Sequence, residues 1–238
     1  MKSKLSDTSL CDVVDFHSHI LHGVDHGSES MKMSLSQIKI AKSYSVNRIL
    51  ATPHFYPNLH TLSSFLKLRD SAALDLKKQI SDNSVEIKLG AEVLICEGLE
   101  RFPGLEKLCF SGTKYIMLEL PTDDFLEEYA VTAGYIADMG YEIILAHADR
   151  YPARAVEIML DYGVKTLQLN AYSISSLFKK KSVWNWIDRG LVSSIGSDIH
   201  GASRFPYKKF QAAKGRLGDL LVPIKESSDR IWDKIGSI

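Results

Sequence analysis

The chain has 238 residues, of which 45% are apolar and 24% charged, and its 29 Lys and Arg residues equal its 29 Asp and Glu residues. This length suffices for a sizeable core in a single domain, and a net charge of zero gives no support to nucleic acid or a membrane surface as a partner. No apolar run approaches the roughly 20 residues that a membrane span needs, and the first residues lack the apolar segment of a signal peptide.

The three cysteines, Cys11, Cys96 and Cys109, are an odd number at unrelated spacings. Such spacing does not indicate a disulfide framework, so we expect free thiols in a reducing compartment. Together with the missing membrane span and signal peptide, this predicts a cytoplasmic protein.

Short apolar runs rich in β-branched residues alternate along the chain with longer segments of helical period. The expected strands are residues 11–19, 47–54, 85–93, 114–121, 141–148, 165–173 and 191–200. The expected helices are residues 30–45, 62–83, 98–108, 126–140, 152–163 and 182–190. In the first helix Met31, Leu35, Ile38 and Ala41 recur at helical spacing. Helix ends are indicated at Asp82, Asn83, Gly140, Gly163 and Gly190.

Strand and helix alternate so often that a parallel sheet with right-handed crossovers is favoured. About seven such units fit a closed or nearly closed barrel better than a doubly wound sheet, and no glycine-rich phosphate loop follows the first strand. We therefore predict a distorted seven-stranded (β/α) barrel.

Every expected strand brings a polar side chain to its carboxyl end, where β/α barrels hold their chemistry. In chain order these side chains are His17 and His19, His54, Glu92, Glu119, His147, Asn170, and finally Asp198 and His200. His17 and His19 are two residues apart, so both point to one face of the strand, which is the inward face if Asp15 and the other odd positions point inward. Packing alone does not explain buried histidines and carboxylates gathered at one rim.

Metal binding explains this set better. The histidines and carboxylates of this rim, together with His26 from the histidine-rich stretch 15–29, are about nine possible ligands, and none of them is cysteine. Such ligands suit Mn²⁺, Fe²⁺ or Zn²⁺. One catalytic ion takes three or four protein ligands, so the set is sized for two or three ions.

Seven motifs occur in one order between residues 12 and 210: DFHSHILHGVDHGS, ILATPHFYP, GAEV, LELP, LAHADRY, LQLNAYS and SIGSDIHG. Together they resemble the polymerase-and-histidinol-phosphatase (PHP) superfamily, and within it the manganese-dependent protein-tyrosine phosphatases of capsular and exopolysaccharide operons. The resemblance implies a single PHP-like phosphatase domain over residues 1–238, with three ions of which Mn²⁺ is the first candidate.

The resemblance also divides the ligands. One ion takes His17, His19, Glu92 and Asp198; a second shares Glu92 and takes Glu119 and His147; the third takes His26, His54 and His200. The family's Asp-Asp-Gly run reads Asp25, His26, Gly27 here, so a histidine replaces a carboxylate at the third ion. Two arginines, Arg150 of AHADR and Arg204 of SDIHGASRFP, are the candidates for binding phosphate oxygens. For each arginine the alternative to phosphate binding is a salt bridge on the surface.

The expected reaction is attack of a metal-activated water on phosphorus, without a phospho-enzyme. The expected substrate is a tyrosine-phosphorylated protein, namely a bacterial tyrosine kinase that controls polysaccharide synthesis or export. The chain offers no Cys followed by five residues and then an Arg, because Phe102 and Tyr115 stand six positions after Cys96 and Cys109. A cysteine-nucleophile phosphatase is thereby excluded.

Three other readings stay open. An amidohydrolase also opens with two histidines on a barrel strand, but it places lysine and histidine where Glu119 and Asn170 stand here. Histidinol-phosphate hydrolysis shares all the ligands. A metal-stabilised scaffold that docks a kinase is a different class, which the unusual residue at position 26 keeps open. The sequence does not indicate an oligomeric state.

Overall fold

The computed structural model describes residues 12–80, 85–121, 125–178 and 180–238. Cys11 and the expected helix end at Asp82 and Asn83 lie outside these ranges. Cys96 and Cys109 are free thiols, as predicted.

Parallel strands form two sheets in the described part of the chain. The shorter sheet has the order β1-β2-β4, and the longer one has the order β3-β5-β6-β7-β8-β9. The strand bounds are β1 Asp15–Ser18, β2 Arg48–Ala51, β3 His54–Phe55, β4 Glu86–Leu89, β5 Glu92–Leu94, β6 Tyr115–Glu119, β7 Glu142–Leu145, β8 Thr166–Asn170 and β9 Val192–Gly196. The predicted α/β class with parallel pairing is confirmed.

Two of the seven expected strands are each broken in two, and the single seven-stranded barrel is not confirmed. Pro53 lies between β2 and β3 and has no N–H for a ladder. Gly90 lies between β4 and β5, where a Cβ would stand 2.6 Å from a ring carbon of Phe110. The two sheets nevertheless meet where Ser18 of β1 forms a parallel bridge with Ile199, three residues beyond the end of β9.

Eight α-helices connect and cover these strands within the described ranges. Their bounds are α1 Met31–Ser43, α2 Leu62–Gln79, α3 Glu127–Asp138, α4 Ala153–Asp161, α5 Ala171–Ser175, α6 Lys181–Asp188, α7 Phe205–Leu217 and α8 Leu221–Trp232. The side chains of Ser30 and Thr61 cap α1 and α2 by accepting backbone N–H bonds. The predicted breaks at Gly140, Gly163 and Gly190 coincide with positive φ angles of 84°, 105° and 69°.

Three parts of the helical pattern differ from expectation. The expected helix 98–108 is two 3₁₀ turns, Leu99–Arg101 and Leu105–Leu108, because Pro103 and Gly104 interrupt it. The expected strand 165–173 ends at Asn170, and α5 follows at once. Helices α7 and α8 have no counterpart in the sequence analysis.

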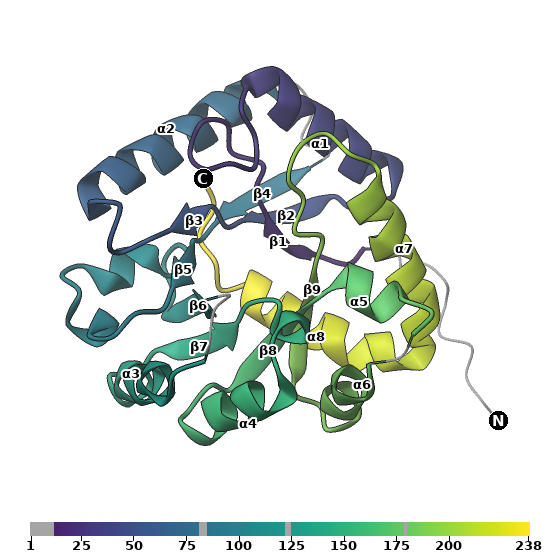
Figure 1. Cartoon of the computed structure of the whole chain (residues 1–238). Helices are drawn as coiled ribbons and strands as arrows, with labels where there is room; N and C mark the ends of the chain where they lie inside the picture. The colour runs from purple at the N-terminus through teal and green to yellow at the C-terminus, as the bar shows by residue number, and fades with distance from the viewer. Residues whose placement is uncertain (1–11, 81–84, 122–124, 179) are drawn as a thin grey trace.

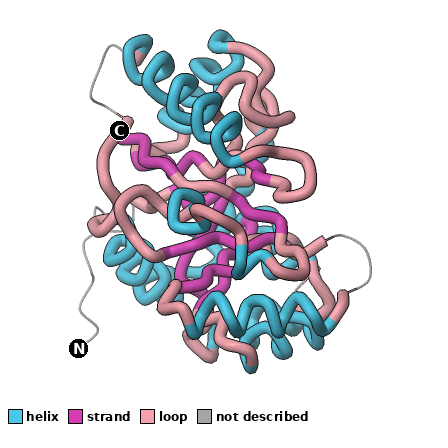
Figure 2. The backbone as a smooth tube through the Cα atoms, turned by 90° about the vertical axis from the view of Figure 1, so that its left-hand side faces the viewer, coloured by secondary structure: helices cyan, strands magenta, loops and turns pink. Residues whose placement is uncertain are grey.

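Most of the helices lie around the strands, whereas α8 passes across the middle of the view in Figure 1; Figure 2 shows the strands in the middle of the molecule. Alternate residues of a strand pack in two apolar clusters, as its two-residue period requires. In β6, for example, Ile116 and Leu118 belong to the larger apolar cluster. Met117 belongs to the smaller one, where it packs with Ile231 and Trp232 at the end of α8. No described helix combines the length and hydropathy needed to cross a membrane.

Candidate metal centre

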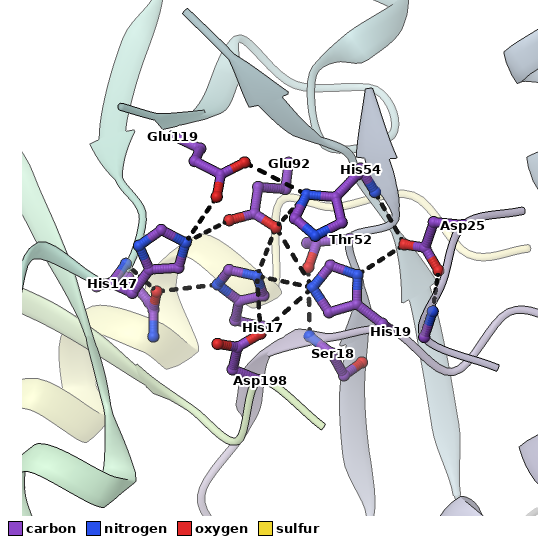
Figure 3. Close-up of polar contacts among 12 residues, drawn as sticks. His17, Ser18, His19, Asp25, Thr52, His54, Glu92, Glu119, His147 and Asp198 are labelled. Atoms are coloured by element: carbon purple, nitrogen blue, oxygen red, sulfur yellow. Dashed lines mark hydrogen bonds and ion pairs between the residues drawn. The ribbon is translucent and has the colours of Figure 1, made fainter. Parts of the chain in front are cut away.

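Histidines and carboxylates converge from the carboxyl ends of β1 and β6, the first residues of β3 and β5, and the turns after β7 and β9 (Figure 3). His54 and Glu92 begin strands instead of ending them, because the breaks at Pro53 and Gly90 precede them. The first group joins the end of β1 to the loop after β9. His17 Nε2 lies 3.0 Å from Glu92 Oε2, and His19 Nε2 lies 3.3 Å from the same oxygen. Asp198 Oδ1 is 3.4 Å from His19 Nε2 and 3.8 Å from His17 Nε2. The structure therefore brings together the four side chains assigned to the first ion.

A second group consists of His147 and His54, which lie against Glu92 and Glu119. His147 Nε2 lies 2.6 Å from Glu92 Oε1 and 3.4 Å from Glu119 Oε1. His54 Nδ1 lies 3.0 Å from Glu92 Oε2 and 3.3 Å from Glu119 Oε2. Glu92 thus faces both groups, in the position expected of a bridging carboxylate.

The third group differs in detail from the set deduced from the motifs. Possible ligand atoms of His19, His54 and His200 lie within 4.8 Å of one another. His26 is exposed, and its ring stacks on His54 at 4.9 Å and on His200 at 4.6 Å between centroids. His26 therefore lies beside this group, but its ring nitrogens are not among the atoms that converge there.

The charges of these histidines and carboxylates show why cations fit between them. Burial alone would lower the pKa of His54 and His147, but the carboxylates of Glu119 and Glu92 raise both pKa values to about 9. Burial would likewise raise the pKa of Glu92, but the charges of His17 and His147 hold it well below its usual range. Protonated imidazoles thus balance ionised carboxylates here, and a divalent ion can replace those protons.

Three buried atoms without a hydrogen bond of acceptable geometry support the same fit. They are His54 Nδ1, Glu92 Oε2 and His200 Nε2, and the first two lie only 3.0 Å apart. Buried polar atoms are nearly always satisfied in proteins. The pKa of His200 falls to about 4, because burial and the charge of His19 oppose protonation. His200 is therefore neutral at pH 7, the form that ligates a metal.

The backbone is constrained at two of these residues. His147 has φ 29° and Asp198 has φ 52°, values that residues with a Cβ seldom adopt. Such conformations cost of order 1–3 kcal/mol each and occur mostly at functional sites. The turn at each residue directs the side chain into the cluster just beyond β7 and β9.

Several residues that orient the ligands were missed by the motif analysis. Asp25 accepts a hydrogen bond from the backbone N–H of His54 at 3.0 Å, and its carboxylate lies 2.7 Å from His19 Nδ1. Gln168 Oε1 lies 3.0 Å from His17 Nδ1 and accepts the backbone N–H of His147 at 2.6 Å. These contacts orient the rings of His19 and His17, as partners of metal-binding histidines commonly do, and hold the backbone at His54 and His147. No sequence signal separated Gln168 from an ordinary strand residue.

Asp15 does not share the direction of His17, contrary to the assumption that the odd positions of the first strand all point inward. Its carboxylate accepts hydrogen bonds from Ser197 and from Tyr207 of α7. The register of β1 against β2 shifts between Asp15 and Ser18, and this irregularity changes the alternation. Asp15 therefore anchors the residue before Asp198 rather than entering the cluster.

The two arginines differ in position. Arg150 donates to Asp198 Oδ2 while its side chain remains 49% exposed. Asn170 donates to the same oxygen at 2.9 Å. Arg204, the residue before α7, is exposed, and its side chain has no hydrogen bond or ion pair to the residues that the structure describes. Only Arg150 touches the cluster.

Fold and site together define an α/β protein with a histidine and carboxylate centre that could hold divalent ions. The family model for capsular polysaccharide synthesis proteins, CpsB/CapC, matches residues 13–214, and the chain belongs to this family.

Curated relatives cover most of the chain. The tyrosine-protein phosphatase CpsB of Streptococcus pneumoniae is 27% identical over 86% of this chain and 93% of its own length. The tyrosine-protein phosphatase YwqE of Bacillus subtilis is 25% identical over 79% of this chain and 77% of its own length. A solved structure from work on YwqE and CpsB, described as unique metal-dependent tyrosine phosphatases, aligns with a TM-score of 0.75 at 20% identity. It covers 95% of this chain and 96% of that chain, and shows the same fold.

Proposed function

We propose that this protein is a metal-dependent protein-tyrosine phosphatase that hydrolyses phosphotyrosine. The observation that carries the proposal is Glu92, which contacts His17 through Oε2 and His147 through Oε1. A shared carboxylate between two ion sites is typical of enzymes that hydrolyse phosphate esters. The names of the curated relatives support phosphotyrosine as the ester.

His17, His19, Glu92 and Asp198 would hold one ion, and Glu92, Glu119 and His147 a second. His54 and His200, with His26, would hold a third. Mn²⁺ is the first candidate, since hard carboxylates and borderline imidazoles both accept it. We take the two sheets as one distorted barrel interrupted at Pro53 and Gly90, and residues 1–238 as a single domain in the cytoplasm.

When bound, divalent ions supply Lewis-acid chemistry, since they lower the pKa of water toward neutrality and neutralise phosphate oxygens. The chain's own residues then position the substrate. Arg150 can turn from Asp198 to phosphate oxygens, where its planar fork binds two at once; Arg204 is the second candidate for this role. The tyrosine oxygen, with a pKa of about 10, leaves with little help from a proton donor.

The proposed substrate in the cell is a tyrosine kinase of polysaccharide synthesis or export. The decisive test compares phosphate release from a phosphotyrosine peptide and from histidinol phosphate by the Mn²⁺-loaded protein. We expect the peptide to be the better substrate, with activity lost on chelation and restored by Mn²⁺. Faster turnover of histidinol phosphate, or full activity in a strong chelator, would contradict the proposal.

Arg150→Ala should weaken inhibition by inorganic phosphate by about tenfold or more, because a hydrogen bond to a charged group contributes about 1.5–3 kcal/mol. Metal content, measured by elemental analysis, should not change. Arg154→Ala is the matched control, since Arg154 is an exposed arginine in the first turn of α4. If inorganic phosphate inhibited both variants equally, Arg150 would not bind the phosphate of the substrate.

A further inference from the structure

A pocket of about 430 Å³ adjoins the metal centre on the side of α5 and α7. Asp198 and Arg150 form the wall that it shares with the cluster. The rest of its lining comes from the turn after β7, from the ends of β8 and β9, and from the two helices, which contribute Tyr172, Phe205 and Lys209. A phosphate bound by Arg150 and by an ion held at Asp198 would carry the rest of its ester into this pocket.

Two exposed aromatic rings line the pocket. Tyr172 is 57% exposed and Phe205 is 53% exposed, and their ring centroids lie 5.9 Å apart. The ammonium of Lys209 lies 5.3 Å from one centroid and 5.2 Å from the other. Exposed aromatic residues that gather beside a polar site commonly mark a ligand surface.

The wall that carries Tyr172 is fixed to the cluster. Asp149, which is buried, accepts the backbone N–H of Asn170 at 2.7 Å and a hydrogen bond from Ser173. Asn170 in turn donates to Asp198. The aromatic surface therefore has a defined position relative to the phosphate-binding residues, as a specificity pocket requires.

We propose that this pocket binds the ring of the substrate phosphotyrosine against Tyr172 and Phe205, and that Lys209 binds an acidic side chain next to that phosphotyrosine. The inference rests on the proposed function and gives it a substrate preference. An aryl phosphate gains contacts with the two rings that an alkyl phosphate cannot make. Lys209 has no carboxylate partner among the described residues, so its charge is available to a peptide.

Binding of phenylphosphonate and methylphosphonate to the Mn²⁺-loaded protein tests the aromatic contact without any turnover. We expect the wild type to bind the phenyl compound about tenfold more tightly, and Tyr172→Ala with Phe205→Ala to remove most of that preference. Tyr135→Ala is the matched control, because Tyr135 is 55% exposed on α3 and does not line the pocket. Equal binding of both compounds by the wild type, or a preference that survives in the double variant, would overturn the proposal.

Charge reversal tests Lys209. One phosphotyrosine peptide carries Glu on both sides of the phosphotyrosine and its partner carries Lys. We expect the wild type to favour the Glu peptide in kcat/KM by about threefold or more, Lys209→Glu to reverse the order, and Lys208→Glu, an exposed neighbour outside the pocket, to keep it. An unchanged order in Lys209→Glu would remove Lys209 from the subsite. If neither peptide is hydrolysed while the phenyl preference holds, the proposed reaction fails and the aryl-binding pocket stands.

Discussion

At Asp198 the backbone limits which substitutions can be interpreted. The residue is left-handed at φ 52°, a region that Asn tolerates better than most side chains. Asp198→Asn therefore removes a charge without adding backbone strain. We predict a fall in kcat/KM of at least about a hundredfold, or ~2.7 kcal/mol of transition-state stabilisation, with reduced metal content.

Two measurements separate this effect from unfolding. Ser45→Asn, at φ 58° and distant from the cluster, is the matched substitution in the same backbone region. Both variants should keep their thermal midpoints near that of metal-free wild type. Retention of more than about a tenth of the wild-type rate by Asp198→Asn would show that Asp198 is no ligand.

His26 is the residue on which motif and geometry differ most. Its exposed ring stacks on His54 and His200, so a carboxylate at this position would stand beside the third group. We predict that His26→Asp needs less added Mn²⁺ for half-maximal activity, because hard cations prefer carboxylate oxygen. His26→Gln, which is neutral, should show no such gain. Superimposable Mn²⁺ titrations of wild type and His26→Asp at pH 7 would mean that position 26 holds no ion.

At the scale of the element, strand β8 contacts both strand β1 and the turn after β7, and each of these carries a candidate ligand. Gln168 on this strand contacts His17 of β1 and the backbone N–H of His147 after β7, and its amide donates to Asn170 at 3.1 Å. We predict that Gln168→Met, of similar size, lowers activity by about tenfold or more and weakens metal binding, since partners of metal-binding histidines commonly contribute that much.

A substitution at the start of the same strand is the control. Thr166 at the start of β8 bonds Leu191 O through its hydroxyl at 3.0 Å, far along the strand from the cluster. Thr166→Val should change stability slightly and leave the Mn²⁺ requirement unchanged. If Gln168→Met behaved in the same way, the link between β8 and the ligands would have no functional effect.

At the scale of the whole molecule, protons and metal ions compete for one set of side chains. The pKa values of His54 and His147 rise from 6.5 to about 9 in the metal-free fold. A raised histidine pKa stabilises the fold fully below 6.5, and this contribution is lost as pH rises through 9. Metal ions stabilise in the opposite sense, because they bind the deprotonated groups of the folded state only.

We therefore predict that Mn²⁺ raises the thermal midpoint little at pH 6 and markedly at pH 8.5. Binding at pH 7 should also release protons, which calorimetry in buffers of different ionisation enthalpy measures. Mg²⁺, which is reluctant to give up its water, should raise the midpoint less and serves as the comparison ion. If Mn²⁺ raised the thermal midpoint more at pH 6 than at pH 8.5, protons and metal ions would not compete for these side chains.

Sequence alone determined the class of fold and predicted most of the candidate ligands that the structure brings together. Apolar runs of strand length and amphipathic helical segments are local properties, so parallel α/β alternation followed from them. Ligands such as His147 and Glu119 were predictable because parallel strands bring their carboxyl ends to one rim.

Tertiary structure decided what depends on contacts between distant segments. The breaks at Pro53 and Gly90 depend on how neighbouring strands and Phe110 approach the chain, and the irregular register of β1 turns Asp15 toward α7. Gln168 and Lys209 gain their positions only because segments far apart in the sequence pack together. Local periodicity carries no information about such contacts, and for that reason the ligands could be predicted but their supports and the adjoining pocket could not.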